Sequence, residues 1–182
     1  QAGGDAKKTV FSGVGKTSEE IITALQANIG CFNVESEEEL LRIEAIAKNM
    51  HKSAAVALRI NPNIDARTHP YITTGLKDTK FGMSEKDALQ LYRRAAKSKH
   101  IKIHGISCHL GSQLTTLDPF LQAVEHLLNL AEQLEKENIL LKAINLGGGL
   151  GVSYQQEKVP TPQEYCQHVL AALKKRHSKL DL

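Results

Sequence analysis

The fold is indicated most clearly by the stretch Lys102-Ile103-His104-Gly105-Ile106-Ser107-Cys108-His109, which predicts a strand, and by the helix and strand expected after it. Asp118 and Pro119 begin that helix, with Asp118 as the N-cap and the proline at the first helical position. The apolar residues of this helix form one stripe at helical spacing: Phe120, Val124, Leu127, Leu128, Ala131 and Leu134. A second strand at 142–146 completes the unit. A strand, a helix and a strand in this order predict a parallel sheet covered by helices.

The same alternation of strand and helix extends along the rest of the chain. Three more strands are expected, at 9–12, 31–34 and 54–60, and each is followed by a helix. The expected N-caps of the remaining helices are Thr17, Ser36, Ser84 and Thr161, and Glu20 and Glu39 are expected to complete capping boxes with the first two. The sequence therefore predicts an α/β protein with about five βα units.

Two architectures share this alternation, the open doubly wound sheet and the closed (β/α)8 barrel. A standard barrel needs eight strands and roughly 250 residues, whereas this chain has 182 residues. The chain is therefore either a complete open sheet or part of a barrel, and periodicity leaves both open. The longest irregular stretch, 61–82, is rich in Pro, Asn, Asp, Thr and Gly and predicts a functional or mobile loop.

The composition excludes several classes of protein. The hydrophobic fraction of 41% and the charged fraction of 24% are ordinary for a globular domain, which excludes a disordered or collagen-like chain. Basic residues exceed acidic ones by only 23 − 20 = 3 and tryptophan is absent, so we expect no nucleic-acid partner. No apolar run approaches the roughly 18 residues that span a bilayer, so no membrane partner is expected. The scattered cysteines, Cys31, Cys108 and Cys166, suit a reducing compartment such as the cytoplasm.

Glycines are concentrated at the ends of two predicted strands. Gly147, Gly148 and Gly149 directly follow the strand at 142–146, and Gly111 follows the strand at 102–109. Ligands of parallel α/β folds bind at the carboxyl ends of the strands. Three consecutive glycines let backbone N–H groups turn toward one anion without obstruction by side chains. We interpret this triplet as a phosphate cradle; the alternative is a tight turn, which seldom needs three glycines.

The segment His109-Leu110-Gly111-Ser112-Gln113 ends the preceding strand. The Ser112 hydroxyl can donate to a phosphate oxygen, and His109 can stack on a flat ring or transfer a proton. Taken alone, His109 is more simply a structural histidine at a strand end. Because this segment and the glycine triplet end consecutive strands, we expect both to face the same crevice.

Four other patterns do not support a site. The stretch Ser12-Gly13-Val14-Gly15-Lys16-Thr17 resembles a P-loop, but the glycine required five positions before Gly-Lys-Thr is Val10, so we interpret it as a strand-to-helix turn. The histidines lack partners at metal-ligand spacing, so no metal site is expected. Cys108 and His109 are neighbours on a strand and point to opposite faces, which argues against a Cys–His dyad. The acidic run 35–39 is interpreted as a helix start.

A set of segments that covers almost the whole chain carries a family resemblance. They are, in order, Phe11-Ser12-Gly13-Val14-Gly15-Lys16-Thr17, Phe32-Asn33-Val34-Glu35-Ser36, Leu58-Arg59-Ile60-Asn61-Pro62, His69-Pro70-Tyr71-Ile72-Thr73-Thr74-Gly75, Lys80-Phe81-Gly82, His109-Leu110-Gly111-Ser112-Gln113 and Asn145-Leu146-Gly147-Gly148-Gly149-Leu150-Gly151. Together they resemble the diaminopimelate decarboxylase family. Each segment alone is modest, but the ordered set is highly specific.

The resemblance implies both a fold and an activity. Members of this family use pyridoxal 5'-phosphate (PLP) to convert meso-diaminopimelate into L-lysine and CO2. Their cofactor domain is an alanine racemase-like (β/α)8 TIM barrel with PLP at the carboxyl ends of the strands. By this resemblance, residues 1–182 are an incomplete PLP-binding barrel domain that corresponds to strands 3–7.

The resemblance also implies roles for single residues. His109 resembles the histidine that packs against the PLP ring in a supporting role. Ser112 and the glycine cradle at 147–149 resemble the groups that bind the cofactor phosphate. Arg59 and Lys80 resemble pocket residues.

The chain departs from the family pattern in three places. It lacks the Tyr-Ala-Val-Lys-Ala type segment that carries the Schiff-base lysine, the Glu-Pro-Gly-Arg type turn, and the C-terminal β-domain that carries substrate-binding groups. The resemblance therefore implies that this chain alone does not decarboxylate and that the full-length enzyme is a homodimer. The alternatives are a decarboxylase of ornithine, arginine or carboxynorspermidine, a non-catalytic PLP-binding barrel, and a barrel that binds another phosphate.

Overall fold

The structure, a computed structural model, describes residues 3–64, 81–154, 157–176 and 179–182 of the chain. Lys80 and the segment 69–75, which the family resemblance singles out, lie outside the described residues. The two ends of the irregular stretch 61–82 are joined to each other. Asn61 N–H donates to the carbonyl oxygen of Met83 at 2.9 Å, and Met83 N–H donates to that of Arg59 at 2.8 Å. Residues 61 and 83 therefore lie side by side next to Arg59.

A parallel sheet of five strands forms the centre of the described chain. The strands are β1 (Val10–Phe11), β2 (Cys31–Val34), β3 (Ala54–Arg59), β4 (Ile101–Ser107) and β5 (Ala143–Asn145). Their order across the sheet is their order along the chain, and every neighbouring pair is parallel. A doubly wound sheet reverses its strand order at a switch point. The unbroken order excludes that architecture and is the order of strands in a barrel.

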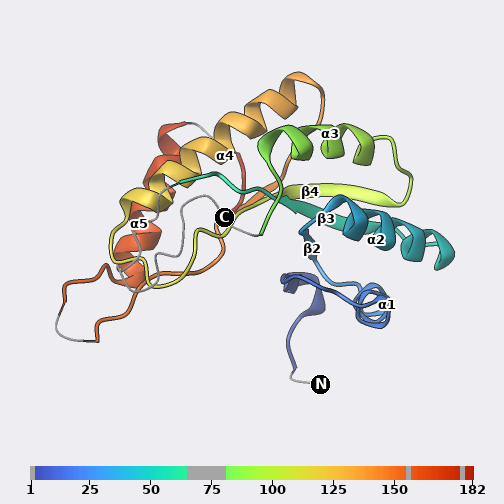
Figure 1. Cartoon of the computed structure of the whole chain (residues 1–182), viewed down its shortest axis with the longest axis horizontal. Coiled ribbons are helices and arrows are strands. Elements are labelled where there is room, and N and C mark those ends of the chain that lie inside the picture. The colour runs from blue at the N-terminus through green and yellow to red at the C-terminus, as the bar shows by residue number, and fades with distance from the viewer. Residues whose placement is uncertain (1–2, 65–80, 155–156, 177–178) are drawn as a thin grey trace.

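An α-helix follows each strand, and these helices cover the sheet from outside: α1 (Ser18–Ala27), α2 (Glu37–Asn49), α3 (Glu85–Ala95), α4 (Asp118–Lys136) and α5 (Pro162–Lys175). A short 3-10 helix, η1 (Ala6–Lys8), precedes β1. Figure 1 shows α1 to α5 following one another around an arc, with the strands and the C-terminus inside it. The prediction of a partial (β/α)8 barrel with five βα units is confirmed. No helix in the described ranges is long and apolar enough to cross a membrane.

Most of the predicted helix starts are confirmed. Thr17 and Thr161 form complete capping boxes, in which each threonine accepts a backbone N–H and a glutamate carboxylate returns to the cap. Ser84 caps α3 with its hydroxyl alone, which accepts the backbone N–H of Asp87. Ser36 also caps α2, but the Glu39 carboxylate turns inward and does not return to the cap. The second predicted capping box is therefore only half formed.

The predicted N-cap of α4 is wrong by one residue. Asp118 is the first residue of the helix, Leu117 is the N-cap, and no side chain caps this end. Leu117 already has helical backbone angles, φ −86° and ψ −20°, so the extended residue on which side-chain capping depends is missing. The Asp118 carboxylate lies in the first turn instead, where it stabilises the helix dipole.

The main core lies between the sheet and the helices. It contains one face of β2, β3 and β4, with Phe32, Val34, Val56, Leu58 and Ile106. Val124, Leu127 and Leu134 of the predicted α4 stripe are fully buried in the same core. Cys31 and Ala57 alternate along β2 and β3 with these core residues. Both are buried, but neither belongs to the main core. Because side chains alternate along a strand, these two mark a second face of the sheet, which we call the inner face.

A bulge in β4 sets the register of the sheet near its carboxyl edge. The pairing of β4 with β3 skips His104. The fully buried Tyr92 hydroxyl bridges the two strands there, accepting from Leu58 N–H at 3.3 Å and donating to the Gly105 carbonyl oxygen at 2.7 Å. A Cβ at Gly105 would lie 2.4 Å from the carbonyl oxygen of Ala143, so only glycine fits between the strands.

Beyond the bulge, the strands end level with one another. Arg59 pairs with Ser107, and Ser107 pairs with Asn145. The segments after β3, β4 and β5 therefore leave the sheet at one edge, the edge where ligands of parallel α/β folds bind. On the far side of β5, Asp181 forms a parallel bridge with Ala143, so the last residues pair with the sheet in the direction of the next strand.

Candidate phosphate-binding site

The structure brings the two predicted ligand segments together at the carboxyl edge of the sheet. Gly148 N–H donates to Nδ1 of His109 at 3.2 Å. Leu114 N–H donates to the Gly149 carbonyl oxygen at 2.8 Å, and Gly151 N–H donates to the Leu114 carbonyl oxygen at 2.9 Å. We call residues 109–112 and 147–149 together the cradle. The two segments that follow consecutive strands therefore lie side by side, joined by these hydrogen bonds.

The fold itself requires two of the three glycines at 147–149. Gly149 has a φ of +104°, and a Cβ there would lie 1.9 Å from the carbonyl oxygen of Gly111. Gly147 has a φ of +73°, and its Cβ would lie 2.7 Å from Nδ1 of His109. Gly148 has no positive φ, and nothing lies within 4 Å of the position of its Cβ. The fold thus explains two of the glycines and leaves open space above the third.

Several hydrogen-bond donors of the cradle are left unpaired by the described residues. Gly111 N–H, Gly149 N–H and the Ser112 hydroxyl make no hydrogen bond in the described part of the chain, and Ser112 is exposed. Neighbouring donors that the described residues leave unpaired suit an anionic oxygen. The observed backbone therefore fits the interpretation as a phosphate cradle.

His109 is held as a neutral ring. The pKa of its imidazole lies below the usual value, first because protein atoms displace water from the ring and then because Arg59 places positive charge nearby. Glu35 opposes this effect with its negative charge. Since Gly148 N–H donates to Nδ1, the neutral ring carries its proton on Nε2. An uncharged ring of fixed tautomer is suited to lie against a flat ligand.

Arg59 lies at the end of β3 and is bound by a carboxylate from the end of β2. Its Nη1 lies 2.9 Å from both carboxylate oxygens of Glu35, and both side chains are largely buried. The guanidinium also lies over the Phe81 ring, 5.8 Å from the centroid. Arg59 therefore enters this edge of the sheet as part of an ion pair rather than as a free cation.

Sequence reasoning missed Glu35, Gln113 and Asn145. Glu35 follows a strand just as His109 does, so the rule that placed the glycines at the carboxyl edge also applied to it. The Asn145 side chain accepts Gly147 N–H at 2.8 Å and so sets the first bend of the cradle. An asparagine close before a glycine-rich turn is a known turn former, and this signal was present in the sequence.

The predictions about the P-loop-like stretch and the cysteine agree with the structure. Thr17 caps α1, as predicted. Lys16 is buried, and its Nζ lies 2.8 Å from the Glu39 carboxylate and 2.7 Å from two carbonyl oxygens. The acidic run is thus more than a helix start, because Glu39 neutralises this lysine. Burial raises the pKa of the Cys108 thiol to about 12, so it forms no thiolate beside His109 at neutral pH.

The inner face of the sheet opens beside the cradle. A cavity of about 500 Å³ is lined there by strand residues such as Asn33, Ala57 and Asn145, and Gly147 lies at its border. A ligand whose anionic end is bound by the cradle therefore has room for its body over the inner face. This is the interior of the barrel in a complete (β/α)8 fold.

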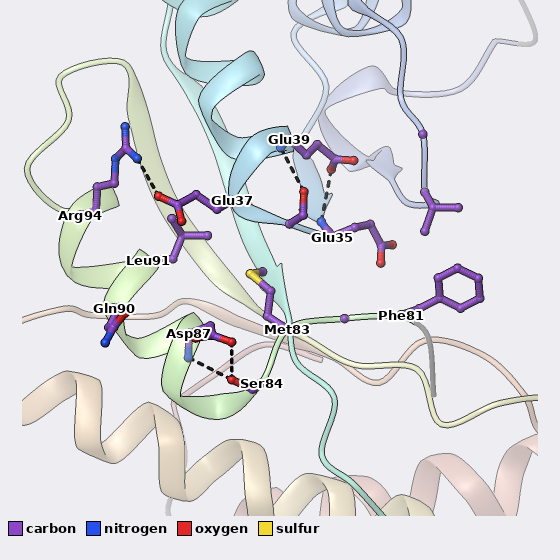
Figure 2. Close-up of a pocket in the computed structure, with 14 residues that line it drawn as sticks. Glu35, Glu37, Glu39, Phe81, Met83, Ser84, Asp87, Gln90, Leu91 and Arg94 are labelled. Carbon is purple, nitrogen blue, oxygen red and sulfur yellow. Dashed lines mark hydrogen bonds and ion pairs between the residues drawn. The ribbon is translucent and has the colours of Figure 1, made fainter. Parts of the chain in front are cut away.

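A larger cavity, of about 680 Å³, lies between the first turns of α2 and α3 (Figure 2). Its charged side chains are engaged with the protein itself: Glu37 pairs with Arg94 at 2.9 Å, and Asp87 accepts the Ser84 hydroxyl at 2.6 Å. Figure 2 shows Glu35 extending toward Phe81 and away from α3. None of the predicted site residues that the structure describes lines this cavity. It is therefore not the candidate site.

Comparison with known proteins agrees with this geometry. The family "Pyridoxal-dependent decarboxylase, pyridoxal binding domain" matches residues 1–181. Curated diaminopimelate decarboxylases of Haemophilus influenzae and Neisseria meningitidis are 54% and 51% identical over 95% and 100% of this chain, and over 42% and 45% of their own lengths. The crystal structure of the Helicobacter pylori diaminopimelate decarboxylase complexed with L-lysine has a TM-score of 0.88 at 43% identity, over 97% of this chain and 45% of that one.

The strand order, with two joined loops at the carboxyl edge as the candidate anion site, defines the class: the chain is part of an α/β barrel. With the match over nearly its whole length, the chain belongs to the family of pyridoxal-dependent decarboxylases. It spans less than half the length of the curated relatives that it matches.

Proposed function

We propose that the full-length protein, the polypeptide encoded by the complete gene, is a diaminopimelate decarboxylase. It removes one carboxylate from meso-diaminopimelate and yields L-lysine and CO2. The observation that carries the proposal is the cradle: loops from two consecutive strand ends lie side by side, with donors left unpaired by the described residues, beside an imidazole whose pKa lies below its usual value. The identity of 51–54% to enzymes of this name supports this substrate over those of related decarboxylases.

The residues of the cradle fit the phosphate of PLP. The N–H groups of Gly111 and Gly149 and the hydroxyl of Ser112 would bind the phosphate oxygens. A side chain at Gly148 would extend into open space, which we assign to the phosphate, whereas a side chain at Gly147 would meet His109 instead. The same donor set would bind other phosphates, so the flat ring of the cofactor is argued from His109.

The chain contributes binding, orientation and charge to the reaction. PLP, when bound, supplies the electron sink for the electron pair that the departing carboxylate leaves behind. His109 would lie against the cofactor ring and, being neutral, adds no charge to it. Arg59 and Glu35 compensate each other at the border of the site. Lys80 is proposed as a further pocket residue from the family resemblance.

The proposal extends to assembly and compartment. We infer a homodimer for the full-length enzyme, as the family resemblance implies. We also infer a cytoplasmic location, which the free state of the three cysteines supports, because disulfides are rare in reducing compartments.

The substrate is tested by assaying the purified full-length protein with PLP. We expect CO2 release from meso-diaminopimelate, with stoichiometric L-lysine, and little release from ornithine, arginine or carboxynorspermidine. A preference for one of these three compounds would reassign the substrate. PLP binding without turnover of any of them would favour the non-catalytic PLP-binding barrel.

The cradle is tested by the variant Gly148→Ala. The fold accepts the added methyl group because its surroundings are empty, so the free energy of unfolding should change by less than about 1 kcal/mol. The methyl group enters the space assigned to the phosphate, so PLP affinity, measured by absorbance titration, should fall at least about tenfold.

Gly149→Ala is the matched control for that variant. Its Cβ would overlap a backbone oxygen, so it should lose both stability and PLP affinity. Normal PLP affinity in a folded Gly148→Ala protein would contradict the phosphate cradle.

A further inference from the structure

Gln113 joins the two sides of the cradle through its side chain. Its Nε2 donates to the carbonyl oxygen of Val152 at 2.5 Å, and its Oε1 accepts Val152 N–H at 3.1 Å. The carboxamide thus binds both backbone groups of one residue, as a peptide unit does in a sheet ladder. Both hydrogen bonds require the amide in one orientation, with nitrogen toward the carbonyl and oxygen toward the N–H.

The carboxamide extends a short ladder between the two loops. Leu114 and Leu150 form an isolated parallel bridge, with Leu114 N–H bound to Gly149 and Gly151 N–H bound to Leu114. The pair between Gln113 and Val152 adds one more connection on the open side of that bridge. At the other end of the cradle, the hydrogen bond from Gly148 to His109 joins the loops. The groups that face the anion therefore lie between two sets of cross-links.

The backbone at Gln113 disfavours the residue that is there. Its φ of +59° lies in the left-handed region, which suits glycine or asparagine better than glutamine. The backbone alone therefore gives no reason for a glutamine. The side-chain hydrogen bonds to Val152 do, because no shorter amide reaches from this position and a carboxylate cannot donate to the carbonyl oxygen.

We propose that Gln113 is a positioning residue for the cofactor phosphate. It holds the Ser112 hydroxyl, which precedes it, at a fixed distance from the N–H groups of the glycine loop, so that both sides of the cradle contact the same phosphate. The inference rests on the function proposed above and adds a residue that touches neither the phosphate nor the substrate.

The test uses Gln113→Gly and Gln113→Asn in the full-length protein. Both residues suit the left-handed backbone, and both remove the pair of hydrogen bonds to Val152, so the fold should be retained, as judged by thermal unfolding. The apo forms are titrated with PLP and with pyridoxal, which lacks the phosphate. Gln90→Ala, which removes an exposed glutamine of α3 far from the cradle, is the control.

We expect PLP affinity to fall about five- to twentyfold in both Gln113 variants, with the affinity for pyridoxal unchanged. The PLP concentration needed for half-maximal activity should rise to the same extent, while kcat at saturating PLP stays near that of the unmodified protein. A general structural role would weaken both ligands alike.

The outcomes separate the two proposals. If the unmodified protein binds PLP no more tightly than pyridoxal, the proposed function fails. If it prefers PLP and the folded variants keep the whole preference, or lose both affinities equally, the role of Gln113 is wrong. If the glycine variant does not fold, the asparagine variant decides by the same criteria.

Discussion

Two glycine-rich turns follow strands of the same sheet, residues 13–16 after β1 and residues 147–151 after β5. Both contain glycines with positive φ, and both lie at the carboxyl edge. In the first turn, the cation that makes a P-loop attractive is buried and bound to Glu39 and to two carbonyl oxygens. In the second turn, Gly149 N–H and the neighbouring Ser112 hydroxyl have no partner among the described residues.

The difference shows what distinguishes a binding turn from a structural one. Glycine content and position at a strand end are the same in both. The distinguishing property is whether the polar groups of the turn are satisfied by the protein itself, because a buried polar group that is already paired has nothing left to offer a ligand. Substitutions in the first turn should therefore change stability, and substitutions in the second should change ligand affinity.

The largest effect is expected at Lys16. It lies in the first turn, which we call the satisfied turn because the protein itself pairs the Lys16 ammonium. Lys16→Met leaves the Glu39 carboxylate buried without its cation, and removing one partner of such a pair costs about 3–5 kcal/mol. We expect a loss of this size in the free energy of unfolding, measured with denaturant in the full-length protein. PLP affinity of the folded fraction should not change.

A double variant provides the control for that prediction. Lys16→Met combined with Glu39→Leu removes both charges, so much of the lost stability should return. A Lys16→Met protein with normal stability and weakened PLP binding would reverse the assignment of the two turns.

The second turn, at 147–151, is called the open turn because it and the neighbouring Ser112 keep donors that the described residues leave unpaired. Substitutions there should lower PLP affinity, by a smaller free energy than the loss of stability expected at Lys16. Ser112→Ala removes one donor to a charged phosphate, which should weaken PLP binding by about 1–3 kcal/mol. Its hydroxyl is exposed and makes no hydrogen bond in the described chain, so the free energy of unfolding should stay within about 0.5 kcal/mol. Titration calorimetry and denaturant unfolding measure the two quantities.

Thr17→Ala is the matched control, because it removes a hydroxyl next to the satisfied turn. It removes the cap of α1 and should cost about 1 kcal/mol of stability without changing PLP affinity. Equal effects of the two substitutions on affinity would show that the turns do not differ as described.

The contrast between the turns also explains how far the sequence predicts the structure. The five strands and the helix starts at Thr17, Ser84 and Thr161 follow from local signals, periodicity and capping, and they are confirmed. The choice between an open sheet and a barrel did not follow from periodicity, because both contain the same βα unit. It depends on which strands are neighbours, and strand order is a long-range property.

The candidate site could be predicted from the sequence only where a residue pattern has few alternative explanations. Three successive glycines at a strand end indicated the cradle, whereas Glu35 was interpreted as part of a helix start because three of its neighbours are also glutamates. Its partner Arg59 lies 24 positions away, and no local pattern connects the two. Sequence reasoning did not identify Gln113 for a related reason: its hydrogen bonds to Val152 join two loops that are distant in the sequence. The pairing of distant polar side chains is what the fold adds to the sequence.

The smallest expected effect concerns pH and reports on the open turn alone. Because the pKa of His109 in the folded protein lies below its ordinary 6.5, the unfolded chain binds this proton first as the pH falls. The free energy of unfolding should therefore decrease with falling pH in the window from 6.5 down to the lowered pKa, and this contribution should level off below it. Ring-proton NMR follows the His109 pKa directly, and His109→Gln should remove this part of the pH dependence.

Charge variants make the same experiment sharper. Glu35→Gln removes a negative charge that raises the pKa of His109, so that pKa should fall further, whereas Arg59→Gln should raise it. Protonation at Nδ1 would also break the hydrogen bond from Gly148 N–H, so the order of the glycine loop and PLP affinity should decrease together below the His109 pKa. A His109 pKa at or above 6.5 would mean that the ring is not held neutral by its neighbours, and the open turn would then lack the uncharged surface proposed for the cofactor.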